Sequence, residues 1–180
     1  MIIAQQKKNE NIAEYILYMW QIEDLIRAYK LDISEIEKNI VQRFEQPDNI
    51  KKQITDWYAG LIDLMSEEKK TETGHLQFIQ NSINDLYDIH LFLLKSPDHL
   101  DYIDIYNKAK AGIGELINKS KGTVENEIEA CFNGLYGLLM LRLQQKTISA
   151  DTISALSAVS QMIGLLSKKH KMIEEGKIEL

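Results

Sequence analysis

Apolar side chains recur at intervals of three and four residues along almost the whole of this 180-residue chain. Such spacing places them on one face of an α-helix, because the helix repeats every 3.6 residues. No window sustains the alternation of a β-strand, and only three valines occur. The pattern therefore predicts an all-α protein.

Helix start and stop signals divide this pattern into seven expected helices. The first five cover about 9–29, 32–44, 48–69, 75–95 and 97–122, the sixth starts at Thr123, and the seventh is capped by Ser149. Asp32, with Glu35 three residues later, forms a capping box, and the only two prolines fall at helix starts. We expect one domain over residues 1–180, an antiparallel bundle of six or seven helices.

The sixth expected helix should be the most central one. Residues 134–141, GLYGLLML, are apolar on all sides, and such a helix needs cover on all sides. Gly134 and Gly137 each cost about 1 kcal/mol relative to alanine, a cost that close approach of another helix usually offsets. The seventh helix offers a surface of small residues, namely Ser154, Ala155, Ser157, Ala158, Ser160 and Gly164. We expect these two helices to pack tightly together.

The composition is that of a soluble globular protein, with 44% hydrophobic and 27% charged residues. The net charge of −6 disfavours a phosphate-backbone binder, which needs clustered lysine and arginine. No segment reaches the roughly 18 apolar residues of a membrane span. We therefore predict neither a nucleic-acid partner nor a membrane partner.

The single cysteine, Cys131, cannot form an intrachain disulfide and lies in an apolar run. A buried, unreactive thiol is the expected state, and it suits a reducing compartment. The first residues, MIIAQQKK, lack the layout of a signal peptide, because their apolar part is short and precedes the charges. The predicted location is the cytoplasm.

The first expected helix carries an aromatic-rich stripe with charged residues on its flank. Glu23 and Asp24 lie four and three residues before Arg27, spacings that allow ion pairs, and Trp20 can lie against the arginine. The simpler interpretation is a charged seam at the rim of the bundle. The functional interpretation is a polar pocket or a docking edge, since tryptophan and arginine are enriched in binding hot spots.

His90 falls on the apolar stripe of the fourth expected helix, near Tyr87. The simpler interpretation is a hydrogen-bonded core histidine, and the sharper one is a proton-transfer group or a metal ligand. No Glu-x-x-His pair recurs on two helices, so we predict no metal and no cofactor. The acids at 98, 101 and 104 are explained by a helix start. The candidate site residues are Trp20, Glu23, Asp24, Arg27, Tyr87 and His90.

Residues 1–7, MIIAQQK, and 11–28, NIAEYILYMWQIEDLIRA, resemble the start of an uncharacterised domain-of-unknown-function family. Its members are helical proteins of about this length from Bacteroidetes-type bacteria. The resemblance extends over the whole chain and implies an all-helical cytoplasmic protein. It carries over no catalytic or binding residue.

Three hypotheses for function follow. The favoured one is a non-catalytic protein that acts through protein–protein interaction or self-association as a homo-oligomer, because the first and sixth expected helices carry more apolar surface than a one-sided helix needs. The alternative is a small-molecule-binding protein or an enzyme with an inter-helix pocket that draws on the candidate residues. The least favoured is a metal-dependent activity of His90 with Asp85 or Asp88.

Overall fold

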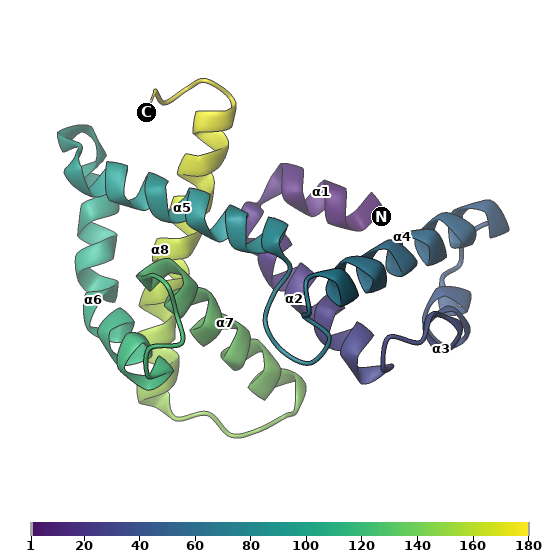
Figure 1. Ribbon diagram of the computed structural model, residues 1–180. Helices are drawn as coiled ribbons and strands as arrows, with labels where there is room; N and C mark the ends of the chain where they lie inside the picture. The colour runs from purple at the N-terminus through teal and green to yellow at the C-terminus, as the bar shows by residue number, and fades with distance from the viewer. Residues whose placement is uncertain (1, 180) are drawn as a thin grey trace. The chain divides into compact units, whose positions relative to one another are not determined.

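The computed structural model describes residues 2–179, and within them the chain forms helices and no strand (Figure 1). The helices are α1 (Ile2–Glu10), α2 (Ile12–Ala28), α3 (Ile33–Asn39), the 3₁₀ helix η1 (Val41–Arg43), α4 (Asp48–Glu67), α5 (Gln77–Lys95), the 3₁₀ helix η2 (Pro97–His99), α6 (Leu100–Ser120), α7 (Glu127–Leu143) and α8 (Ala150–Glu174). The predicted all-α class is confirmed.

The described residues divide into two compact units. Unit 1 contains residues 2–10 and 14–81, and unit 2 contains residues 11–13 and 82–179. One boundary along the chain falls within α2 and another within α5, so each of these helices has residues in both units. The single domain expected over residues 1–180 stays a prediction.

The first expected helix, about 9–29, corresponds to α2, and α1 is an additional helix that ends one residue before Asn11. The Asn11 side-chain oxygen accepts hydrogen bonds from the Ala13 N–H at 3.0 Å and from the Ser167 hydroxyl at 2.7 Å. Asparagine favours this capping role, since its side-chain oxygen accepts one of the first N–H groups of a helix, which have no backbone partner within the helix. The described residues therefore form eight α-helices where the spacing of apolar residues predicted seven, and α1 is the one that was not predicted.

Capping residues also set the starts of α3, α7 and α8, two of which were predicted correctly. The Asp32 and Ser149 side chains accept backbone N–H groups at the starts of α3 and α8, as expected. The start of α7 lies at Glu127 instead of Thr123, because Asn126 is its N-cap and accepts the Glu129 N–H at 2.9 Å. Local capping chemistry therefore moved one helix start by four residues.

Unit 1 contains α1, most of α2, α3, α4 and the start of α5, and α4 packs against α3 and η1. Its fully buried side chains include Ile16, Met19, Trp20, Ile26, Ile36, Val41, Tyr58, Met65, Leu76 and Ile79. Burial, with the nearby Tyr18 phenol adding to it, raises the pKa of Tyr58 to about 12. The Tyr58 phenol of α4 thus stays protonated near neutral pH.

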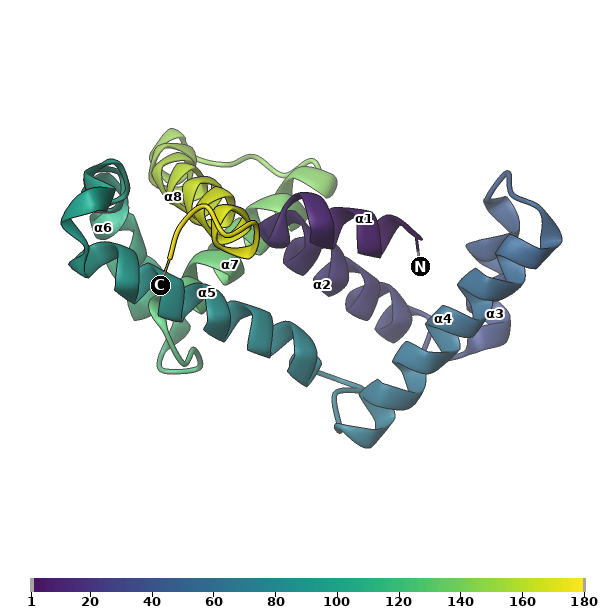
Figure 2. The same ribbon diagram turned by 90° about the horizontal axis from the view of Figure 1, so that it is seen from above.

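Unit 2 is built on α6 and α8, which run antiparallel beside each other (Figures 1 and 2). Asp101 near the start of α6 bonds Lys169 near the end of α8, while Gly112 of α6 faces Ala155 of α8. A Cβ at Gly112 would lie 3.3 Å from the Ala155 carbonyl oxygen. The small residues of α8 thus allow close approach of α6, a partner that the sequence did not indicate.

The helix α7 packs against both α6 and α8. A Cβ on Gly134 would lie 2.6 Å from a Leu116 methyl carbon of α6 and 3.2 Å from a Leu156 methyl carbon of α8. A Cβ on Gly137, in contrast, would meet nothing within 4 Å. The expected close approach at Gly134 is therefore present, but it involves two helices and only one of the two glycines.

Candidate functional site

The predicted site residues fall into two clusters, one in each unit. Trp20, Glu23, Asp24 and Arg27 lie in unit 1, and Tyr87 and His90 lie in unit 2. Each cluster gains residues that were absent from the predicted set. We call them the Glu23 cluster (Trp20, Glu23, Asp24, Arg27 and His75) and the His90 cluster (Tyr87, His90, Tyr102, Tyr106 and Glu127).

The Glu23 cluster is centred on a carboxylate with a side chain that is 0% exposed. One Glu23 oxygen lies 2.6 Å from Nδ1 of His75, and the other accepts the Leu76 N–H at 2.8 Å. The His75 ring stacks on the Trp20 indole, with centroids 4.0 Å apart and planes 9° apart. Both carboxylate oxygens are thus satisfied, as a buried acid requires.

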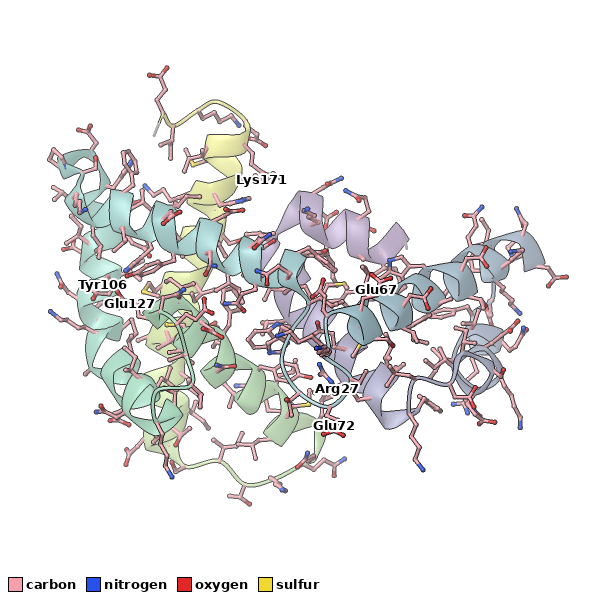
Figure 3. The ribbon with its side chains drawn as sticks, in the orientation of Figure 1. Arg27, Glu67, Glu72, Tyr106, Glu127 and Lys171 are labelled. Carbon is pink, nitrogen blue, oxygen red and sulfur yellow. The ribbon has the colours of Figure 1, made fainter. Side chains whose placement is uncertain are left out.

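Arg27 secures the loop between α4 and α5 from the same helix (Figure 3). Its guanidinium donates to the Lys70 carbonyl at 3.1 and 3.3 Å and to the Gly74 carbonyl, and it pairs with Asp24 at 2.9 Å. Gly74 has a φ of +83°, which glycine adopts at low cost. The charged flank of α2 therefore holds the chain that leads into α5.

The Glu23 cluster leaves one ring nitrogen of His75 available. Because an ionised carboxylate only accepts hydrogen bonds, we assign the proton to Nδ1, and Nε2 of a neutral ring is then an acceptor. Nε2 has no hydrogen-bond partner among the described residues, and the side chain is 22% exposed. A histidine held in this way can transfer a proton or bind a ligand.

The His90 cluster joins α5, α6 and α7 through an imidazole that is 0% exposed. Nδ1 of His90 lies 2.6 Å from the Tyr102 hydroxyl, and Nε2 lies 2.9 Å from the Glu127 carboxylate. The Tyr106 hydroxyl donates to the other Glu127 oxygen at 3.2 Å, and the two side chains meet in Figure 3. The Tyr87 ring stacks beside His90 at 6.1 Å.

Hydrogen-bond directions in the His90 cluster follow from the carboxylate. Glu127 can only accept, so Nε2 of His90 carries a proton, and Nδ1 of a neutral ring accepts from the Tyr102 hydroxyl. Every hydrogen-bonding position of the imidazole is then used. Such a satisfied buried network makes three helices adopt one arrangement.

Electrostatics in the His90 cluster favour an ionised Glu127. The hydrogen bond from His90 holds the pKa of Glu127 below its ordinary value, despite partial burial, and Tyr106 and Lys110 act in the same direction. Burial raises the pKa of Tyr102 and that of Tyr106, and the negative charge of Glu127 adds to both effects. The tyrosines therefore stay protonated donors around a carboxylate.

Cys131 lies close to this network and is chemically quiet. Burial raises the pKa of its thiol, and the negative charge of Glu127 raises it further. The thiolate is the reactive form of cysteine, so a raised pKa makes the residue less reactive. This agrees with the expected buried thiol.

A third polar group ties α8 to the start of α6. The Lys169 ammonium bonds Asp101 at 2.9 Å and lies 3.4 Å from Nδ1 of His99. The hydrogen bond to Lys169 holds the pKa of Asp101 below its ordinary value, and the charge of Lys169 adds to it. This group therefore links the end of α8 to the start of α6.

One apolar surface of unit 2 stands out. Along α7, Tyr136, Leu139, Met140 and Leu143 follow the i, i+3, i+4, i+7 spacing of a single helix face. We call these four residues the α7 stripe. Its first three members are half-buried, and Leu143 is 63% exposed. The cover that an all-round apolar helix needs is therefore incomplete on this face.

A separate groove of about 480 Å³ runs between α6 and α8. It is lined by Lys108, Ala150, Ile153, Ser154, Ser157, Ala158 and Gln161. None of the predicted site residues lines this groove. Three of its lining residues, Ser154, Ser157 and Ala158, belong to the small-residue surface of α8.

His75 and Glu127 are central to the two clusters and were not among the predicted site residues. His75 lies 52 residues from Glu23, and Glu127 lies 37 residues from His90. The one available signal was chemical, because a buried histidine or carboxylate needs a polar partner. That rule predicts a partner and leaves its position open.

The described residues contain no group of three or more His, Cys, Asp or Glu side chains placed to hold a metal ion. Within the same residues, no helix combines the length and apolarity needed to cross a membrane.

Comparison with known proteins assigns the chain to a family. A family model described as a domain of unknown function, DUF4924, matches residues 1–177. Searches of curated proteins and of solved structures find no match. The resemblance seen in the first 28 residues is thus confirmed and extends over nearly the whole length. The chain belongs to the DUF4924 family.

Proposed function

We propose that this protein is a non-catalytic interaction protein that self-associates through the α7 stripe. The observation that carries the proposal is Leu143, a large apolar side chain that is 63% exposed at the end of a half-buried apolar face. Exposed apolar side chains that continue such a face mark interaction surfaces more often than isolated ones do. Anchors at i, i+3, i+4 and i+7 are also the pattern by which one helix docks on a partner.

The polar clusters fit this proposal as supports of the fold. Arg27 and Glu23 hold a loop, and His90 and Glu127 connect three helices, so much of the buried polar chemistry is used within each unit. We also infer a cytoplasmic setting, because the one cysteine is a buried thiol that needs no oxidising compartment.

Analytical ultracentrifugation of the purified protein tests the proposal, from about 10 µM to about 500 µM, a range suited to weak interfaces. The average mass of the wild type should rise with concentration, and Leu143→Asp should weaken association about tenfold or more. Ile117→Asp is the matched control, since Ile117 is an exposed apolar residue of α6 outside the stripe. A wild type that stays monomeric throughout, or equal loss in both variants, would refute the proposal.

The second candidate function is small-molecule binding or proton transfer at the Glu23 cluster. The observation that favours it is the available Nε2 of His75, with Nδ1 fixed by a buried carboxylate. A fragment screen by NMR would test it, with His75→Gln as the comparison. Fragments that shift the His75 and Trp20 ring signals of the wild type, and do not bind the variant, would support this function. A screen without such fragments would count against it.

A further inference from the structure

We propose that the surface that meets the α7 stripe is the start of α6 in a second copy of this chain. We call that surface the Leu100 patch, defined by Asp98, Leu100 and Asp104. This inference rests on the proposed self-association and names its second surface.

The first support is exposure. Leu100 is 64% exposed and Leu143 is 63% exposed, and these are the two most exposed large hydrophobic side chains among the described residues. The next is Ile153 at 44%. Leu100 and Leu143 lie apart on the same unit. One can therefore bury the other only when Leu100 of one copy meets Leu143 of another copy.

The second support is charge. All the charged Asp, Glu, Lys and Arg positions within four residues of Leu100 are occupied by acids, namely Asp98, Asp101 and Asp104. Within four residues of Leu143, every such residue is basic, because residues 139–147 contain only Arg142 and Lys146. An exposed leucine in an acidic setting is thus electrostatically complementary to an exposed leucine in a basic one.

These charges are available for a partner. Among the described residues, Asp98 and Asp104 form no ion pair, and neither do Arg142 and Lys146, whereas Asp101 is held by Lys169. Acids at a helix start and bases at a helix end also favour the helix dipole. That local role explains the signs of the charges and leaves the two exposed leucines unexplained.

The third support is placement within unit 2. The start of α6 and the end of α7 lie at opposite ends of this unit in both views (Figures 1 and 2). The two surfaces of one copy therefore cannot reach each other. A contact between different surfaces of successive copies is heterologous, so it builds chains or closed rings instead of stopping at a two-fold dimer.

The test uses two full-length variants, Leu100→Asp and Leu143→Asp, each with one surface disabled. Both changes lie at exposed positions, and circular dichroism verifies that the variants fold. In ultracentrifugation, each variant alone should show at least about tenfold weaker association than the wild type. An equimolar mixture should form a 1:1 dimer and nothing larger, because each variant retains one working surface. Association of the wild type should also weaken when salt rises from about 0.05 M to about 0.5 M, as screening predicts.

The outcomes separate this inference from the proposed function. If Leu143→Asp is monomeric while Leu100→Asp associates like the wild type, the stripe is an interface and the Leu100 patch is not its partner, so only this inference fails. If the mixture of variants stays monomeric, the heterologous pairing is wrong. If the wild type never associates, both proposals fail.

Discussion

The two histidine clusters each pair a carboxylate with an imidazole, but the buried group is the carboxylate in one cluster and the imidazole in the other. In the Glu23 cluster the carboxylate is 0% exposed and its histidine, His75, is 22% exposed. In the His90 cluster the histidine is 0% exposed and its carboxylate, Glu127, is 20% exposed. The same two chemical groups are present in both clusters. Which of them water can reach therefore depends on how the surrounding helices pack.

This difference determines whether the ring nitrogens of each histidine can bind something new or are already used in holding the fold together. His75 keeps one nitrogen without a partner among the described residues, so it can still meet a proton or a ligand. His90 uses both nitrogens within unit 2, so any new contact would break an existing one. A buried histidine on an apolar stripe is thus the structural one here, and the histidine next to a loop is the available one.

The largest expected effect is on stability at His90. His90→Ala should lower the free energy of unfolding by about 3 kcal/mol, because it empties a buried site and leaves the Tyr102 hydroxyl without its partner. His75→Ala should cost about 1 kcal/mol, since that ring is partly exposed and water can take its place as the hydrogen-bond partner of Glu23. Urea denaturation monitored by circular dichroism measures both. Equal losses would show that burial does not distinguish the clusters.

The next largest effect is expected at the two carboxylates, where the Glu23 cluster should be the more sensitive of the two. Glu23→Gln should cost about 2 kcal/mol, because a buried amide group would face the donors His75 and Leu76. Glu127→Gln should cost about 1 kcal/mol or less, because water can reach that side chain. The same denaturation experiment applies. A larger loss for Glu127→Gln than for Glu23→Gln would contradict the comparison.

A smaller effect is expected in the pH dependence that Glu127 contributes. Its pKa is lower in the folded protein than in the unfolded chain, so the ionised form favours folding. The contribution is complete above the ordinary glutamate pKa of about 4.3 and is lost as the pH falls through the lower folded value. Glu127→Gln should therefore flatten the stability curve below about pH 4.

Urea denaturation between about pH 2.5 and pH 7 would show this flattening, and Glu125→Gln provides a matched control, because Glu125 is exposed two residues earlier. Parallel curves for the wild type and Glu127→Gln would mean that the hydrogen bond to His90 does not favour the ionised form.

The last expectation changes no stability and concerns access alone. Diethyl pyrocarbonate, which modifies exposed neutral imidazoles, should label His75 much faster than His90 at one fixed pH. Peptide mapping by mass spectrometry distinguishes the two sites. Comparable labelling of His90 in the folded protein would show that the burial of its ring is not maintained in solution.

Local signals were sufficient for much of the fold. The three-and-four spacing predicted helices, and the caps at Asp32 and Ser149 were confirmed in place. The helix α1 was missed, because the polar run at residues 5–10 interrupts the apolar pattern that marks the other helices. Whether a segment is helical depends on many residues, whereas the position of a helix end depends on one or two.

The candidate site was predicted in part. Trp20, Glu23 and Arg27 share one helix, so their grouping followed from spacing, and the structure gives them a common role at the loop before α5. The grouping of those residues with Tyr87 and His90 stays a prediction. Their own partners, His75 and Glu127, come from other helices and loops, which no spacing rule along the chain connects.

The sequence by itself determined the helical class, the caps at Asp32 and Ser149 and the family membership, because these depend on backbone hydrogen bonds and residue types within a few turns. Only the tertiary structure decided that Glu23 meets His75, that His90 meets Glu127, and that Leu100 and Leu143 stay exposed. The reason is physical: a side chain's partner and its access to water depend on how helices distant in the chain pack against each other.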